Sequence, residues 1–146
     1  MKKYLLFLVA LLMVTGTARA QRGLNCSAVF KGKIVPTNKM IETEVRGSRI
    51  STYKLDYYHC VQFQTDETTT RKVAGLVSSD AAARSAEIEN TGEILTYALI
   101  QPKPFRKANR YLCYQARPVG HGWIITLLYL EGSATLDELR NMFEKQ

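Results

Sequence analysis

The sequence predicts an α+β fold, a two-layer sandwich in which an antiparallel sheet of about five strands carries two helices on one face. Two observations lead to this prediction. Short segments that alternate apolar and polar residues are separated by turn residues, which is typical of antiparallel strands. Two other segments repeat apolar residues at helical spacing. Helices of this kind most simply pack side by side on one face of such a sheet.

The first two strands are expected at 40–45 and 53–64, on either side of a turn at Gly47 and Ser48. Both segments alternate apolar and polar side chains. Because successive side chains on a strand point to opposite faces, one set should face the core. In the second strand the more apolar set is Leu55, Tyr57, His59, Val61 and Phe63.

Three more strands are expected at 93–101, 111–117 and 123–130. A turn at 90–92 precedes the first of them. The run 123–130 is the most hydrophobic outside the N-terminal segment, which indicates a central strand buried on both faces. In the strand 93–101 we expect an inward face made of Leu95, Tyr97 and Leu99.

The first helix is predicted to begin after Asp66, because aspartate is a favoured N-cap residue. We expect the residues Ser-Ser-Asp at 78–80 to interrupt it, and 81–86 to form one or two further turns. The apolar face of this helix is predicted to contain Val73, Leu76 and Val77.

The last helix is predicted to begin with Thr135 as its N-cap residue and Glu138 at the capping-box position. In a capping box the N-cap side chain accepts a hydrogen bond from the backbone N–H three residues later, and the side chain at that later position accepts one from the N-cap backbone N–H. The apolar stripe that should pack on the sheet consists of Leu136, Leu139 and Phe143.

Residues 1–20 have the pattern of a cleavable signal peptide. Lys2 and Lys3 form a positive start, 4–14 form an apolar core, and small residues at Ala18 and Ala20 form a cleavage site. The apolar core is well below the roughly 20 residues that a membrane-spanning helix needs. We therefore expect cleavage near Ala20, a periplasmic or secreted location, and a single domain at 21–146 with no stable membrane insertion.

The charge of the expected mature chain is moderate. Loss of Lys2, Lys3 and Arg19 lowers the formal net charge from +7 to +4, since residues 1–20 contain no acidic side chain. A nucleic-acid-binding protein is expected to carry a stronger basic stripe. We therefore expect no nucleic-acid partner.

The three cysteines, Cys26, Cys60 and Cys113, allow at most one internal disulfide and leave at least one thiol. Their spacing does not select a pair. His59 and Cys60 are neighbours on a strand, so their side chains should point to opposite faces and cannot act as a nucleophile and its base. We expect His59 to be a hydrogen-bonded histidine of the core.

No pattern in the sequence indicates a metal, a cofactor or a catalytic residue. Neither a CxxC nor an HxxxH pair is present, and the chain has two histidines. Phosphate-binding glycine loops and nucleophile elbows are also missing. Scattered acidic residues such as Glu42 and Glu44 are interpreted as solvated strand edges. We therefore expect no metal and no cofactor, and the sequence gives no reason to assign an enzyme activity.

The loop at 103–110 combines four cations with one aromatic side chain. Such a charge run is ordinarily a solvated turn. The functional interpretation is a contact loop, because an exposed phenylalanine beside arginine is typical of interface hot spots. On this interpretation the chain is a non-enzymatic interaction or accessory protein that binds an envelope protein. The candidate binding residues are Lys103, Phe105, Arg106, Lys107 and Arg110.

An alternative site is an aromatic face of the sheet that binds a small ligand or a glycan. Tyr58, Gln62 and Tyr111 could line it, since tyrosine rings with polar neighbours suit sugar or peptide ligands. This hypothesis requires the second face of the sheet to be open to solvent.

The segments 109–114, 125–132, 134–139 and 43–55 together resemble a family of small exported proteins of Gram-negative gut anaerobes whose function is unknown. The resemblance covers most of the chain after residue 20. It implies export and a single domain. It implies no activity, because the matching residues belong to strands and helices and carry no catalytic signature.

Overall fold

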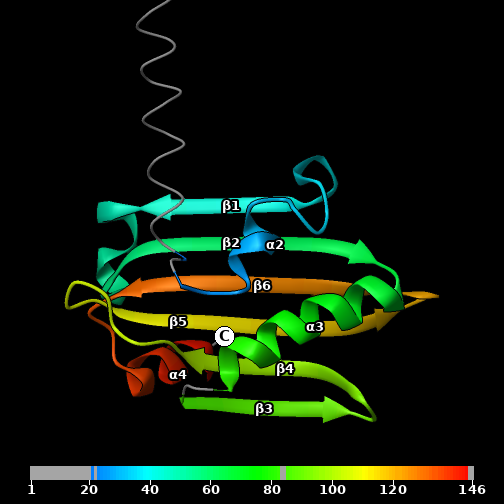
Figure 1. Cartoon of the computed structure of the whole chain (residues 1–146). Coiled ribbons are helices and arrows are strands. Elements are labelled where there is room, and N and C mark those ends of the chain that lie inside the picture. The colour runs from blue at the N-terminus through cyan, green and yellow to red at the C-terminus, as the bar shows by residue number, and fades with distance from the viewer. Residues whose placement is uncertain (1–20, 22, 83–84, 145–146) are drawn as a thin grey trace, which may run out of the picture.

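The computed structural model describes residues 21, 23–82 and 85–144. The predicted signal peptide at 1–20 lies outside the described residues. Six antiparallel strands form one sheet in the order β1-β2-β6-β5-β4-β3 (Figure 1). The strands are β1 Ile41–Arg46, β2 Leu55–Thr65, β3 Ser85–Thr91, β4 Ile94–Gln101, β5 Asn109–Val119 and β6 Gly122–Gly132; the helical segments are α2 Ser27–Phe30, η1 Thr37–Lys39, η2 Gly47–Tyr53, α3 Glu67–Ala81 and α4 Leu136–Glu144.

The prediction of five strands is wrong, because β3 is a sixth strand in a segment for which helical turns up to residue 86 and a turn at 90–92 were expected. Residues 86–89 alternate apolar and acidic side chains, and the whole segment pairs with β4. As an edge strand it is exposed from 86 to 91, and its apolar side chains belong to neither buried cluster. The class remains α+β, but the sheet is larger than predicted.

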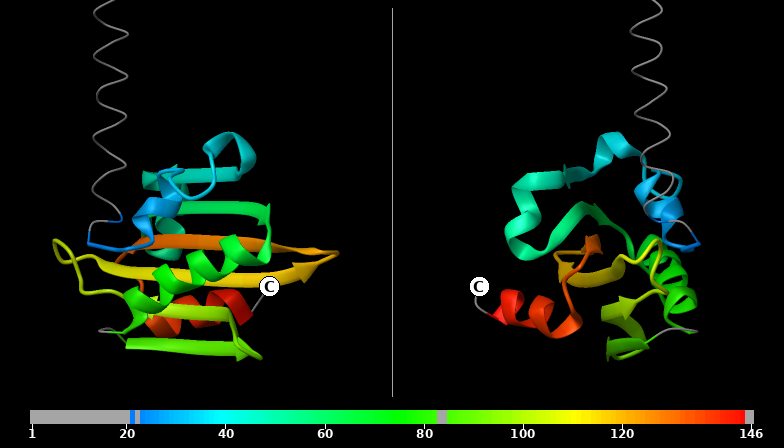
Figure 2. Two further views of the ribbon diagram at one scale, coloured as in Figure 1. Left: turned by 45° about the vertical axis from the view of Figure 1, so that its right-hand side comes forward. Right: turned by 90° about the vertical axis from the view of Figure 1, so that its left-hand side faces the viewer.

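The prediction of two helices on one face is also wrong. In the two views of Figure 2, α2 and α3 lie on one side of the sheet, and α4 lies on the other. The apolar side chains form two separate buried clusters that match this arrangement. Leu112 and Leu127 belong to the cluster beneath α2 and α3, whereas Tyr111 and Leu130 pack with Leu139 of α4. Adjacent residues of β5 therefore face opposite layers, and each layer needs its own helix.

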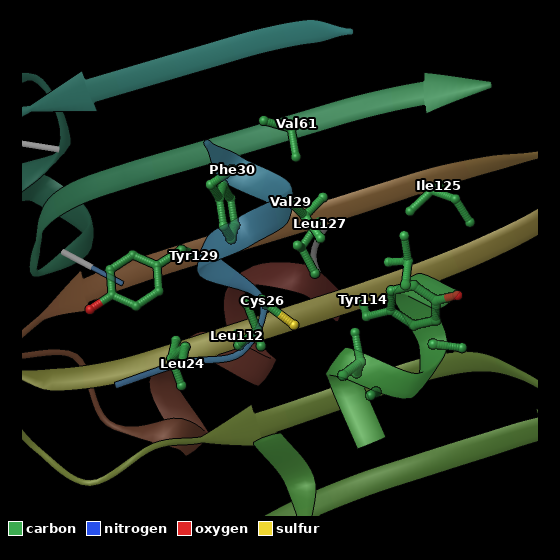
Figure 3. Packing of buried hydrophobic residues seen from close by; sticks show 14 of the residues in the cluster. Leu24, Cys26, Val29, Phe30, Val61, Leu112, Tyr114, Ile125, Leu127 and Tyr129 are labelled. Carbon is green, nitrogen blue, oxygen red and sulfur yellow. The ribbon is translucent and has the colours of Figure 1, made fainter. Parts of the chain in front are cut away.

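The larger cluster is centred on β5 and β6 and is covered by α2 and α3. Figure 3 shows Val29 and Phe30 of α2 pointing toward the sheet, where Val61 and Leu127 lie. These four side chains are all at most 4% exposed. Burial of side chains of this size stabilises a fold by about 1.5–3 kcal/mol each. The short helix α2 is therefore held by its core contacts rather than by its own length.

The helix α3 begins as predicted and continues further than predicted. The Asp66 side chain accepts a hydrogen bond from the Thr69 N–H at 2.8 Å, which caps the first turn. Val73 and Val77 are fully buried. The helix is not interrupted at 78–80 but runs to Ala81. Asp80 stays in the helix because its carboxylate accepts hydrogen bonds from the backbone at the start of α2.

Two irregularities change which face some residues occupy. The register of β2 shifts between Leu55 and Tyr57, so Leu55 packs with α4 while Tyr57 packs with α2. A second shift, between β3 and β4, places Leu95 in the cluster beneath α3. Leu99 is paired with Cys113 and lies on the opposite face from Leu112. Strict alternation placed Leu55 on one face with Tyr57, and Leu95 on one face with Leu99, whereas each pair is divided between the two faces.

The last helix has the predicted cap. The Glu138 N–H donates to Thr135 Oγ1, and the two side chains are 3.2 Å apart. Glu138 also forms an ion pair with Lys54 at 2.7 Å. Leu139 is 1% exposed and faces the sheet, whereas Leu136 is half-buried. The side chain of Phe143 lies outside the described part of the structure.

Candidate functional site

The basic loop forms a tight hairpin that projects beyond the end of the sheet (Figure 1). Phe105 and Ala108 exchange two backbone hydrogen bonds of 3.2 and 3.0 Å. Between them, Arg106 and Lys107 have positive φ angles of 50° and 66° and are exposed. Two consecutive positive φ angles define a type I′ turn, which ordinarily contains Asn-Gly. Left-handed conformations of other residues cost of order 1–3 kcal/mol each, so this turn presents two cations at the expense of stability.

The other candidate residues of the loop have different environments. Lys103 is exposed, and Phe105 is half-buried with the Arg106 guanidinium 5.3 Å from its ring centre. Arg110 is 7% exposed, and its Nε donates to the Tyr129 hydroxyl at 2.8 Å. Arg110 is therefore part of the packing against the sheet, and the exposed cations of the loop are Lys103, Arg106 and Lys107.

The alternative ligand face is open over part of its area. Tyr58 and Gln62 are half-buried, but Tyr111 is fully buried and its hydroxyl donates to the Ala134 carbonyl at 2.7 Å. Tyr111 is therefore not accessible to a ligand. Away from α4, the register places four polar side chains in one row across β2, β6, β5 and β4: Gln62, Thr126, Gln115 and Tyr97.

The three cysteines are free thiols and are too far apart to form a disulfide. Cys60 and Cys113 are both paired with Leu128, one on each side of β6. Two strand spacings separate them by about 9.5 Å, and a disulfide needs Cα atoms within about 7 Å. Cys26 is fully buried under the opposite face.

Burial raises the pKa of all three thiols. The pKa of Cys113 rises to about 12, mainly because desolvation disfavours the thiolate. Desolvation also raises the pKa of Cys60, and it does so strongly for Cys26, where the Asp80 carboxylate adds to the effect. The thiolate is the reactive form, so these environments do not favour a nucleophilic or redox cysteine.

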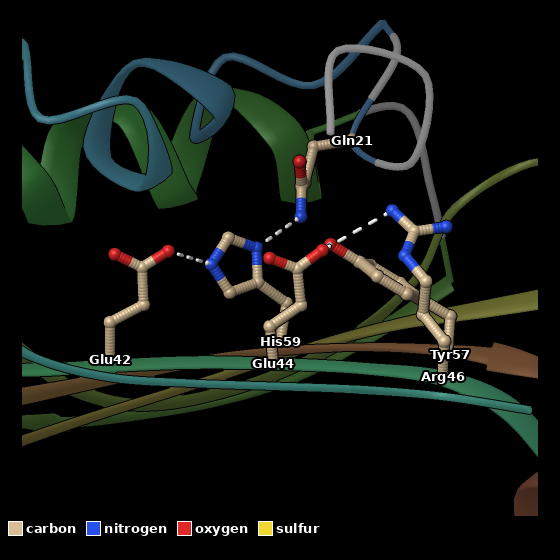
Figure 4. A network of polar contacts seen from close by, with 6 residues as sticks. All are labelled: Gln21, Glu42, Glu44, Arg46, Tyr57 and His59. Atoms are coloured by element: carbon tan, nitrogen blue, oxygen red, sulfur yellow. Dashed lines mark hydrogen bonds and ion pairs between the residues drawn. The ribbon is translucent and has the colours of Figure 1, made fainter. Parts of the chain in front are cut away.

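A polar network that the sequence did not reveal as a site surrounds His59 (Figure 4). His59 is 2% exposed, and its ring packs against Phe30 with centroids 4.8 Å apart. The two ring nitrogens have different partners. Nδ1 lies 2.9 Å from the side-chain nitrogen of Gln21, and Nε2 lies 2.8 Å from a carboxylate oxygen of Glu42. The expectation of a hydrogen-bonded core histidine is therefore confirmed.

Glu44 extends this network along β1. Its carboxylate accepts hydrogen bonds from the Tyr57 hydroxyl at 3.0 Å and from the Arg46 guanidinium at 3.2 Å. Arg46 also lies over the Tyr57 ring, 4.2 Å from its centre. Burial, followed by the charge of Glu44, raises the pKa of the Tyr57 hydroxyl, so this tyrosine is a hydrogen-bond donor and not a base.

The network is created by strand register. Glu42 and Glu44 are two residues apart on β1, so their side chains point to the same face. Glu44 is paired with His59 of β2. Side chains of paired residues lie on the same face, so both carboxylates are brought to the imidazole. Two acidic residues at positions i and i+2 opposite a histidine are the only signal in the sequence, and it has meaning only once the pairing is known.

Three sets of side chains could therefore carry function: the exposed cations of the hairpin, the polar row on the open face, and the acidic network around His59. None of them has the arrangement of a nucleophile, a base and an orienting group that catalysis by a triad needs. Among the described residues, no helix is long and apolar enough to cross a membrane.

Comparison with known proteins supplies a family but no function. The chain matches no curated protein and no solved structure. Residues 13–143 match a family of unknown function, DUF6108, and the chain belongs to that family.

Proposed function

We propose that the chain is an exported, non-enzymatic interaction or accessory protein of the cell envelope, and that it binds an acidic surface of another envelope protein through the hairpin at 103–109. The observation that carries this proposal is the turn at Arg106 and Lys107. Both residues are exposed and both adopt the left-handed conformation. Backbone strain of this kind persists where function requires it more often than at random surface positions.

The chemistry of the hairpin favours an anionic protein partner. Lys103, Arg106 and Lys107 are exposed cations within five residues. Phe105 supplies an apolar contact beneath the Arg106 guanidinium. Arginine with an aromatic neighbour is enriched in interface hot spots, and surrounding charges increase the rate of association with an acidic partner.

The hairpin allows a variant that removes the charges and improves the fold. Arg106→Asn with Lys107→Gly converts the turn to the sequence that a type I′ turn prefers. The matched control is Arg71→Gln with Lys72→Gln, which removes the same pair of residue types from the exposed face of α3. Both variants have the same net charge.

The test is crosslinking of each variant in intact cells, followed by affinity capture and mass spectrometry. The proposal expects the wild type and the α3 control to capture the same envelope protein, and the hairpin variant to lose it while being at least as stable. If the hairpin variant retains every partner, the binding role of the loop is wrong. Export is checked separately, because the mature chain isolated from the cell envelope or medium should begin at Gln21; an intact N-terminus in the cytoplasm would contradict it.

A second candidate function is carbohydrate binding on the open part of the α4 face. The polar row of Gln62, Thr126, Gln115 and Tyr97 supports it, because amides and hydroxyls suit sugar hydroxyls and a tyrosine ring can stack on a sugar. The test is a glycan array with the wild type and with Gln62→Ala plus Gln115→Ala. Loss of a reproducible signal in the variant supports this function, and an absence of any wild-type signal contradicts it.

A further inference from the structure

We propose that Glu42, Glu44 and His59 form a binding site for a divalent first-row transition-metal ion on the edge of the sheet. This inference does not depend on the partner or ligand proposed above. One ligand atom from each of the three residues can be chosen so that all three lie within 4.8 Å of one another. The proposed site is contrary to the expectation of no metal. That expectation was based on the absence of metal-ligand motifs such as CxxC and HxxxH within one segment of the sequence.

The distances suit a metal after a movement of the Glu44 side chain. Zinc binds imidazole nitrogen and carboxylate oxygen at about 2.0–2.2 Å, so two ligands of one tetrahedral ion are about 3.4 Å apart. His59 Nε2 and Glu42 Oε1 are already 2.8 Å apart. The ligand atoms of the three residues lie within 4.8 Å of one another, so Glu44 must approach by up to about 1.4 Å to complete a tetrahedral set. Its side chain is 29% exposed and that of Glu42 is 36% exposed, so both can move and water can complete the coordination.

His59 is a better ligand than an exposed histidine because its orientation is fixed. The imidazole is held by Phe30 on one side and by hydrogen bonds at both nitrogens. Three protein ligands with positions open to water are the usual arrangement of an accessible zinc site. The ligands also come from two paired strands, which position side chains more rigidly than loops do.

Gln21 provides the outer partner that a metal-binding histidine needs. In proteins, a histidine that binds a metal through one nitrogen almost always donates the other N–H to an acceptor. The Gln21 side chain is buried and lies 2.9 Å from His59 Nδ1. With its amide nitrogen toward the ring, Nδ1 accepts and Nε2–H donates to Glu42. A turn of the amide presents the Gln21 oxygen to Nδ1–H, and Nε2 becomes a metal ligand while the imidazole stays neutral.

The local charge favours a cation. Two carboxylates lie near the imidazole, and Arg46 contacts Glu44 at 3.2 Å. Arg46 therefore competes with a metal for Glu44. The mixed set of one imidazole and two carboxylates is suited to zinc, iron or manganese rather than to magnesium or calcium, which prefer oxygen ligands alone.

The test is titration of the protein, purified without a histidine tag, with Zn²⁺ by calorimetry and with Co²⁺ by visible absorption. Glu42→Gln with Glu44→Gln removes two ligands on an exposed edge, so the fold should be retained. The matched control is Glu87→Gln with Glu89→Gln, which changes the same acidic spacing on β3, the other edge strand. We expect one Zn²⁺ per chain, binding that is lost in the β1 variant, and binding that is unchanged in the β3 variant.

Four single variants separate a metal site from a purely structural network. His59→Gln should abolish the Co²⁺ spectrum, whereas His121→Ala, at the exposed histidine, should leave it unchanged. Gln21→Ala should weaken Zn²⁺ binding about 10- to 100-fold, the usual cost of losing an outer partner. Arg46→Gln should tighten binding, because it removes the competing cation. Absence of Zn²⁺ binding, binding that survives the β1 variant, or equal binding of Ca²⁺ would each overturn the proposal.

Discussion

The carboxylate of Asp80 in α3 binds the backbone of Cys26 at the start of α2, 54 residues earlier in the chain. Its two oxygens accept hydrogen bonds from the N–H groups of Asn25 at 2.7 Å and Cys26 at 2.9 Å. Asp80 is 6% exposed and Cys26 is fully buried. A buried acidic side chain thus joins the N-terminal segment to α3 and positions the segment that carries Gln21 and Phe30 over His59.

Asp80→Asn should destabilise the protein, although it preserves the shape of the side chain. An amide has one acceptor oxygen, so its NH₂ group must face one of the two backbone donors. The free energy of unfolding should fall by at least about 1.5 kcal/mol, since hydrogen bonds to charged groups contribute about 1.5–3 kcal/mol each. Urea unfolding measures this. Asp137→Asn, at a side chain that is 90% exposed, is the control and should change stability by less than about 0.5 kcal/mol; equal effects would contradict the role of Asp80.

The local features of the fold could be predicted from the sequence, and the tertiary ones could not. The caps at Asp66 and Thr135 depend on residues three positions apart, and both were predicted. Asp80 looked like a helix interruption because serine and aspartate are weak helix formers. Its buried acceptor role depends on a segment more than 50 residues away.

Strand register explains what the sequence left hidden in the sheet and in the candidate site. β3 was missed because its first residues were assigned to helical turns that continue α3, and Leu55 was assigned to the wrong layer because a bulge resets alternation. The burial of His59 could be predicted from its apolar neighbours in the sequence. Its contact with Glu42 could not, because that contact depends on the pairing of β1 with β2.

Gly132→Ala and Gly75→Ala should have opposite effects. A Cβ at Gly132 would overlap the Lys54 carbonyl oxygen and approach Leu55 Cα, where the backbone cannot move freely. The free energy of unfolding should fall by about 1–3 kcal/mol, as in other overpacked sites. Gly75 lies exposed in α3 with open space around it. There alanine should raise stability by about 0.5–1 kcal/mol through helix preference. Thermal unfolding of both variants checks the pair, and a stabilised Gly132→Ala would contradict the close strand contact.

The helix caps predict a loss of stability in acid. A hydrogen bond from the Thr69 N–H lowers the pKa of Asp66, and the ion pair with Lys54 lowers the pKa of Glu138. A group whose pKa is lower in the folded state stabilises the fold above its unfolded pKa, near 4, and loses this effect as the pH falls through the folded pKa. Asp66→Asn with Glu138→Gln should therefore reduce the dependence of the melting temperature on pH below about 4.5. Glu93→Gln, in the turn before β4, is the control. If the melting temperature falls equally in acid for the wild type, the double variant and the control, the prediction is wrong.

The thiols should be unreactive while the protein is folded. Burial raises the pKa of Cys113 to about 12, so almost no thiolate is present at pH 8. We expect Cys26, Cys60 and Cys113 to resist iodoacetamide in the native state, and all three to be alkylated in denaturant. Intact-mass measurement counts the labels. The same measurement without reductant should find no disulfide, because β6 separates Cys60 from Cys113 and the sheet separates both from Cys26. Rapid native labelling of one cysteine would instead show that its surroundings open readily and would contradict the prediction.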